Sequence, residues 1–174
     1  MLKSVKLLYL TGLLCYWKMT LPRAYLTDRQ LEIWKLLFRG LSKAEVGRRL
    51  GITRQGVYDT EKQMLKKVES ALNHVAQVNR LDVDYLDPSK GILHGYHPSM
   101  RNRVIVTFSA RNGVQTWHYE DPDCEACRWE DNCKQRLLAE AEERDIQLLE
   151  EERKLPPSEL AHLIFSSVIP GLTP

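Results

Sequence analysis

The chain has 174 residues, of which 43% are hydrophobic and 28% are charged, and its formal net charge at pH 7 is +2. This length fits one or two small soluble domains. No stretch approaches the roughly 20 apolar residues of a membrane-spanning helix, which excludes an integral membrane protein of that kind. The charge is unevenly placed, since residues 28–80 carry 11 Lys and Arg against 6 Asp and Glu, whereas residues 119–155 carry 6 against 13. A polyanionic partner would bind the first of these segments.

Residues 1–25 are expected to form an N-terminal extension. Their basic and apolar start resembles a signal peptide, but Leu14 precedes Cys15 at the place where a lipoprotein signal has a small residue. Met19 would make an alternative start, which would leave residues 1–18 as a misassigned extension. The other interpretation is a short helix or strand packed on the body of the protein.

The segment 26–80 is expected to contain three helices. At the first two, a Thr or Ser followed three residues later by Gln or Glu makes a capping box, and a Gly stands where each helix ends. These signals are Thr27 with Gln30, Ser42 with Glu45, Gly40 and Gly51. The third helix begins after Thr53 and meets no breaking residue before Arg80, so we expect it to run for about six or seven turns.

The second and third helices have the order of a helix-turn-helix, a motif in which the second helix presents its first residues to the major groove of DNA. Apolar residues of this pair are expected to pack on the first helix. The expected contacts are Val46, Leu50, Ile52 and Val57 against Leu31, Trp34 and Phe38. The alternative is a three-helix core that binds no ligand.

The polar side chains on the outer face of the motif are candidates for DNA contacts. Arg54 can pair with guanine or phosphate, Gln55 can bind adenine, and Tyr58 can contact a thymine methyl group or a phosphate. Asp59 is expected to pair locally, because a carboxylate is a poor neighbour for phosphate. The candidate DNA-contacting residues are Lys43, Arg48, Thr53, Arg54, Gln55, Tyr58 and Lys62.

The sequences LTDRQ at 26–30, GLSKAEV at 40–46 and LGIT at 50–53 resemble the DNA-binding domains shared by the LuxR family and region 4 of sigma-70 factors. The run VYDTEKQMLKKV that follows is more similar to the sigma side, from which Gly56 departs. The arrangement as a whole resembles archaeal Tfx-type transcription regulators, which place such a domain before an unrelated one. The resemblance covers residues 26–72, and it implies that Thr53 to Lys62 face the major groove of duplex DNA.

Apolar residues in the long third helix are spaced alternately by four and three positions, which is typical of a coiled-coil seam. Such a seam would pair with the same helix of a second copy and make a homodimer. Packing within one chain would produce the same stripe. The seam consists of Met64, Val68, Ala71, Val75 and Val78.

Beyond Arg80 the pattern predicts three or four antiparallel strands, because short β-like runs alternate with turn signals such as Asn112-Gly113. The expected strands are 81–86, 92–96, 103–109 and 114–119, followed by an acidic helix over about 134–153 and an apolar helix over 158–168. The acidic run 140–152 is expected to be a solvated helix face, or otherwise a surface for a partner. The fold class is therefore α+β, with parts at 26–80, 81–133 and 134–174.

Cys124, Cys127 and Cys133 lie close together, and with His118 they offer a complete ligand set for tetrahedral zinc. An iron–sulfur cluster is the alternative cofactor, because C-x2-C-x5-C resembles the last three ligands in base-excision DNA glycosylases, although Trp117 stands where their first cysteine would be. The fourth ligand would then be His118, His97, His94 or Cys15. Metal-free cysteines acting as small apolar residues are a third interpretation, and exposed thiolates would also suit a redox or metal sensor.

The leading hypothesis is a cytoplasmic, sequence-specific regulator of transcription that binds double-stranded DNA and has a metal-stabilised C-terminal part. We find no nucleophile beside a histidine, no paired acids at a set spacing and no phosphate-binding loop, so we do not expect an enzyme. The alternatives are a DNA-processing enzyme that carries an iron–sulfur or zinc site, and an adaptor that binds RNA polymerase through its acidic and sigma-like helices.

Overall fold

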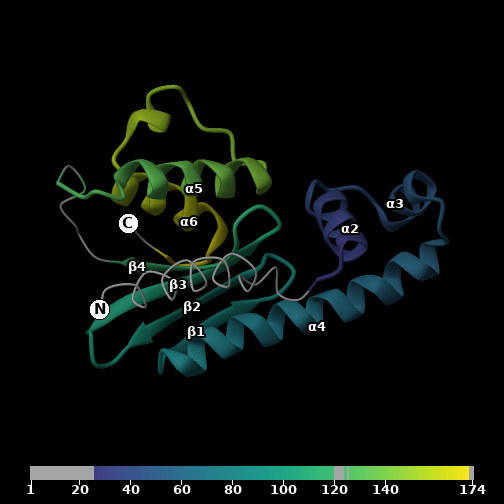
Figure 1. Ribbon diagram of the computed structural model, residues 1–174, viewed down its shortest axis with the longest axis horizontal. Coiled ribbons are helices and arrows are strands. Elements are labelled where there is room, and N and C mark those ends of the chain that lie inside the picture. Colours follow the sequence, from purple (N-terminus) through teal and green to yellow (C-terminus); the bar gives the residue numbers. More distant parts are fainter. Residues whose placement is uncertain (1–25, 120–123, 125, 173–174) are drawn as a thin grey trace, which may run out of the picture.

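A computed structural model describes residues 26–119, 124 and 126–172, and shows an α+β fold (Figure 1). The expectations for residues 1–25, including the alternative start and Cys15, lie outside the described residues. The elements are α2 (Asp28–Phe38), α3 (Lys43–Leu50), α4 (Arg54–Val78), β1 (Asp82–Asp87), β2 (Ile92–His97), β3 (Asn102–Ser109), β4 (Gly113–Tyr119), α5 (Glu130–Glu143), the short helix η1 (Glu152–Lys154) and α6 (Pro157–Val168).

Local signals place the first two helices as the sequence predicts. The Thr27 hydroxyl accepts a hydrogen bond from the Gln30 amide N–H at 3.2 Å, and the Thr27 N–H donates to the Gln30 side chain at 3.1 Å. The Ser42 N–H donates to the Glu45 carboxylate at 2.8 Å. Both capping boxes are complete, and α4 runs without interruption for 25 residues.

The four strands in the described part of the chain form one antiparallel sheet in the order β1-β2-β3-β4. Its turns are short, and Gly113 adopts a positive φ of 70° where the last hairpin closes, a conformation that glycine reaches without steric cost. In the register of that hairpin, Ile105 pairs with Trp117 and Val104 pairs with His118. Successive side chains point to opposite faces of a sheet, so these two pairs belong to opposite faces.

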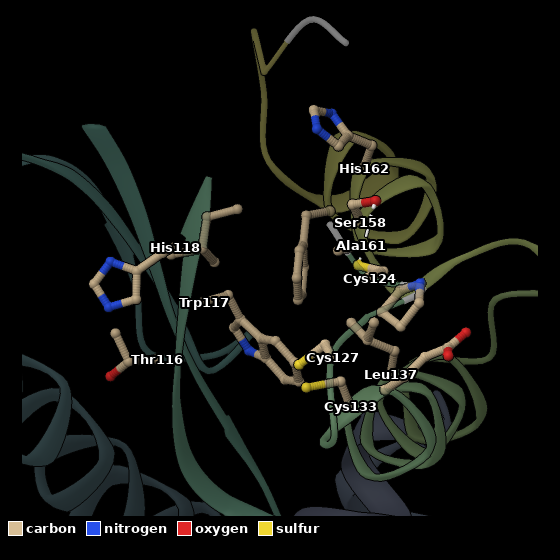
Figure 2. Close-up of a pocket in the computed structure, with 14 residues that line it drawn as sticks. Thr116, Trp117, His118, Cys124, Cys127, Cys133, Leu137, Ser158, Ala161 and His162 are labelled. Atoms are coloured by element: carbon tan, nitrogen blue, oxygen red, sulfur yellow. Dashed lines mark hydrogen bonds between the residues drawn. The ribbon is translucent and has the colours of Figure 1, made fainter. Parts of the chain in front are cut away.

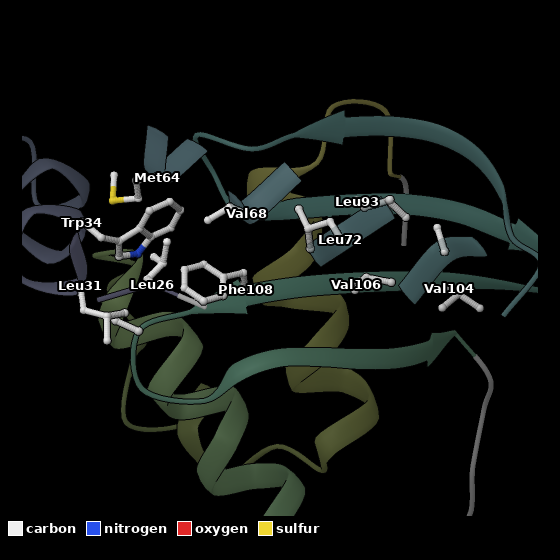
Figure 3. Close-up of a cluster of buried hydrophobic side chains, with 12 residues drawn as sticks. Leu26, Leu31, Trp34, Met64, Val68, Leu72, Leu93, Val104, Val106 and Phe108 are labelled. Atoms are coloured by element: carbon white, nitrogen blue, oxygen red, sulfur yellow. The ribbon is translucent and has the colours of Figure 1, made fainter. Parts of the chain in front are cut away.

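Helices cover both faces of the sheet, and the core has a layer on each side (Figure 1). Helix α4 covers one face, where Met64, Val68 and Leu72 are buried against Leu93 and Val106 (Figure 3). Helices α5 and α6 cover the other face. The buried residues there include Ile92, Ile105, Leu137, Leu160, Ile164 and Phe165.

The apolar stripe of α4 packs within the chain. Met64 and Val68 are buried against the sheet, and Ala71 and Val75 pack beside them. Val78 is 66% exposed, at the last turn of the helix. Met64 and Val68 are therefore not available to a second copy, and packing within the chain accounts for the spacing of the stripe.

Helix α2 is apolar on two sides, which the sequence prediction did not allow for. Leu31 and Trp34 join the core beside the sheet, with Phe38 packed against it. Ile33 and Leu36 instead form a separate small core with the next two helices. The apolar residues of α3, α4 and the turn between them were predicted to pack on Leu31, Trp34 and Phe38. They pack instead on this second side of α2, and they are Val46, Leu50, Ile52 and Val57.

The acidic helix is shorter than predicted. It ends at Glu143, because Asp145 adopts a left-handed φ of 54° and the Ile146 N–H donates to the Ala141 carbonyl at 2.9 Å, which closes the helix end. Ile146 and Leu148 then fold back against the core under α5 and α6. The apolar residues after the helix thus override the helical propensity of the acidic run.

Gly47 allows α3 to approach the turn that leads into α4. A Cβ at this position would lie 2.8 Å from the Ile52 carbonyl oxygen, a backbone atom that cannot rotate away. We predict that Gly47→Ala lowers the free energy of unfolding by about 1–3 kcal/mol, the usual cost of overpacking, as measured by urea denaturation. Gly56→Ala is the control, because its Cβ meets the Thr53 hydroxyl at 3.3 Å and no other neighbour within 4 Å. Equal losses in the two variants would contradict the prediction.

Candidate nucleic-acid interface and cysteine pocket

The first turns of α4 present polar side chains to solvent. Arg54, Gln55 and Lys62 are exposed, and Tyr58 is 48% exposed although its side chain is largely apolar. Val57, on the other side of the same turn, is fully buried. One side of the helix start is therefore packed in the core, and the opposite side is accessible to solvent. This is the arrangement predicted for a surface that contacts a partner.

Several of the predicted DNA-contacting residues already have partners within the chain. The Thr53 hydroxyl caps α4 by accepting from the Gly56 N–H at 3.0 Å. The Lys43 ammonium lies 2.9 Å from a carboxylate oxygen of Glu61 and 5.8 Å from the centre of the Tyr58 ring. A phosphate would have to compete with Glu61 for Lys43, whereas Arg48 is exposed on the outside of α3.

Asp59 accepts a hydrogen bond from the Gln55 side-chain amide at 3.0 Å. This is the local pairing predicted for Asp59. The two side chains lie one helical turn apart on the exposed side of α4, so the bond orients the Gln55 amide in the absence of a partner.

A cavity of about 290 Å³ lies on the other face of the sheet, between β4, α5 and α6. Its walls include the apolar side chains of Trp117, Leu137 and Phe165. All three cysteines of the cluster line it, together with Ser158 and His162 of α6. We call this cavity the cysteine pocket, and Figure 2 shows the Cys127 and Cys133 sulfur atoms turned toward Trp117.

His118 is not directed at the three cysteines. It borders the pocket, but its exposed imidazole projects from the opposite side of β4 to Trp117 (Figure 2). The cause is the two-residue alternation of a strand, because the partner of His118 in the sheet, Val104, is buried on the α4 side. The predicted grouping of His118 with the cysteines is therefore absent from the described structure, whereas His162 was missed because it comes from a distant helix.

The three cysteines are free thiols, and Cys124 and Cys127 precede α5 whereas Cys133 lies in its first turn. The Cys127 N–H donates to the Cys124 carbonyl at 3.1 Å, and the Cys124 sulfur lies 3.7 Å from the Ser158 hydroxyl oxygen. Burial, and then the neighbouring Cys127 thiol, raise the pKa of Cys133. Among the described residues, no three Cys, His, Asp or Glu side chains are gathered closely enough to hold a metal ion.

A set of polar contacts joins the end of α5 to α2 and to the β3–β4 turn. One oxygen of the Glu143 carboxylate accepts from the Trp34 indole N–H at 3.1 Å and from the Ala110 N–H at 2.6 Å, and the other accepts from the Arg111 N–H at 3.2 Å. We call these contacts, with those of Glu140 and Arg144, the α5 junction.

Glu140 and Arg144 form a buried ion pair in the α5 junction. The Arg144 guanidinium lies 3.0 Å from Glu140 Oε2, and the two side chains are 3% and 0% exposed, respectively. The same guanidinium donates to the Lys90 carbonyl at 2.7 Å and lies 5.6 Å from the centre of the Phe38 ring. The other Glu140 oxygen accepts from the Asn112 amide at 3.1 Å.

The prediction that residues 140–152 are a solvated helix face is therefore wrong at Glu140, which has no exposed surface. Charge composition did not indicate this burial. The available signal was the spacing of Glu140 and Arg144, an i,i+4 pair of opposite charge within an otherwise acidic run.

Comparison of the chain with family profiles, with curated proteins and with solved structures gives no match. Within the described ranges, no helix has the length and apolar character that crossing a membrane requires.

Removal of one partner of the buried ion pair should be costly, because the remaining charge would stay buried without its counterion. We predict that Glu140→Ala lowers the free energy of unfolding by about 3–5 kcal/mol, as measured by chemical denaturation. Glu142→Ala is the matched control, since the Glu142 side chain is 68% exposed in its pair with Arg111 and should contribute no more than about 1 kcal/mol. A Glu140 variant as stable as the Glu142 variant would show that the buried pair contributes nothing.

Proposed function

We propose that the chain is a sequence-specific regulator of transcription that binds double-stranded DNA, with a zinc site in its C-terminal part. One observation carries the DNA-binding proposal. The segment 51–53 joins α3 directly to α4, and α4 is buried at Val57 while its first turns expose Arg54, Gln55 and Tyr58. This is the arrangement that a helix-turn-helix needs to place a helix start in the major groove.

The location of these helices supports the proposal. Helix α3 and the start of α4 lie at one end of the molecule, away from α5 and α6 (Figure 1). A duplex could approach this end without meeting the helices on the far side of the sheet. The exposed side chains there include Arg48, Arg49, Arg54 and Lys62, which would attract phosphates along with the positive end of the α4 dipole.

The cysteine pocket supports the metal part of the proposal. Three thiols in an apolar cavity at a helix start are soft ligands suited to zinc, and an iron–sulfur cluster would use the same donors. A zinc ion held by four protein ligands would stabilise the chain around α5 and α6, since such closed sites are structural.

The DNA-binding proposal predicts a loss of affinity when the exposed start of α4 is altered. Arg54→Ala and Gln55→Ala should each weaken binding by about 1–3 kcal/mol at sites that their side chains contact, and should relax the base preference there. The measurement is fluorescence anisotropy on duplexes selected from a random-sequence pool. The association constant should also fall steeply as salt concentration rises, because bound phosphates release counterions.

Arg153→Ala is the control for these variants, because Arg153 is exposed on η1, outside the proposed interface, and its loss removes the same charge. It should leave affinity and base preference unchanged. Binding that is insensitive to salt, or equal in all three variants and the original chain, would contradict the proposal.

The metal proposal predicts that protein purified without air contains about one zinc ion per chain, and that Cys127→Ser loses it, because a structural site needs all four ligands. Elemental analysis and visible absorption measure this together. A brown protein with iron and sulfide would show the alternative cofactor. Metal-free protein that also fails to take up added zinc would contradict both.

A further inference from the structure

We propose that His162 of α6, in place of His118, is the fourth ligand of a tetrahedral zinc site whose other ligands are Cys124, Cys127 and Cys133. This inference rests on the zinc binding proposed above and adds the identity of the ligand that links the cysteine segment to α6. It does not depend on whether the protein binds DNA.

The register of the sheet argues against His118. Its strand neighbour Trp117 faces the cysteine pocket and contacts Phe165 of α6, with ring centres 5.7 Å apart. His118 must then point to the α4 side (Figure 2). Turning its imidazole into the pocket would require a one-residue shift of β4, which would carry the half-buried Trp117 to the other face.

The packing of α6 favours His162. Ser158 and His162 lie one turn apart on the same side of this helix, and Ser158 already contacts the Cys124 sulfur at 3.7 Å. Both line the cysteine pocket with the three cysteines. The imidazole turns away from the sulfur atoms in Figure 2, so metal binding requires the His162 side chain to rotate toward the pocket.

The donor set fits the chemistry of the ion. Three thiolates and one neutral imidazole make a closed tetrahedral zinc site, and the three thiol protons are released to solvent when the ion binds. The ligands would come from both sides of the pocket, from the segment before α5 and the first turn of α5 on one side and from α6 on the other. The ion would thus join two helices whose other contacts in the pocket are largely apolar, among them Leu137 and Phe165.

The test compares two histidine variants of the full chain. Metal is removed from reduced protein by a chelator, and Co²⁺ and then competing Zn²⁺ are added while visible absorption reports the coordination. His162→Ala should lower affinity for both ions by more than about 100-fold, which exceeds the 10–100-fold loss typical of residues that only orient a ligand. His118→Ala should leave affinity and the Co²⁺ spectrum unchanged. Circular dichroism of the metal-free variants checks that each retains its fold.

A third variant tests coordination directly. His162→Cys should restore tight binding and increase the sulfur-to-cobalt charge-transfer absorption, because four thiolates then replace three. An affinity for His162→Ala equal to that of the original chain, or a loss confined to His118→Ala, would overturn the assignment of His162 and leave the proposed zinc site standing. An original chain that binds neither ion would overturn the zinc site as well.

Discussion

Helix α4 buries Val57 in the small core with α2 and α3, and two turns later it buries Met64 and Val68 against the sheet. Because a single uninterrupted helix makes both contacts, the direction in which its first turn points is fixed relative to the sheet. The exposed residues of that turn are held on a rigid support, which is what a surface that recognises a defined partner requires. The apolar stripe that suggested a dimer instead builds this support.

The α5 junction gives α2 a second attachment. The Trp34 ring packs edge-on against the Phe108 ring, with ring centres 5.0 Å apart, and its indole N–H donates a hydrogen bond to Glu143. The Trp34 side chain therefore belongs to both the apolar core and the polar junction. Burial of the neighbouring Glu140 and Arg144 removes two charges from water, and their mutual contacts offset that cost only in one geometry. The junction therefore contributes to the specificity of the packing.

Helix α5 runs from the cysteine pocket to the α5 junction. Cys133 lies in its first turn beside the cysteine pocket, and Glu143 ends it at the junction with α2. The two residues are ten positions apart, which corresponds to roughly 15 Å along a helix. The pocket and the support of the candidate DNA-binding helices are thus at opposite ends of one rigid element.

Local sequence signals determined α2, α3, α4 and the four strands, because caps, glycines and apolar periodicity act over a few residues. They also placed Arg54, Gln55 and Tyr58 on an exposed side of α4. Only the tertiary structure decided which layer covers each face of the sheet, and hence that His118 points away from the cysteines while His162 lines their pocket. The same nonlocal packing buried Glu140 and placed the apolar stripe of α4 against the sheet. Sequence periodicity defines which side of a helix is apolar, but the residues that cover that side come from distant parts of the chain.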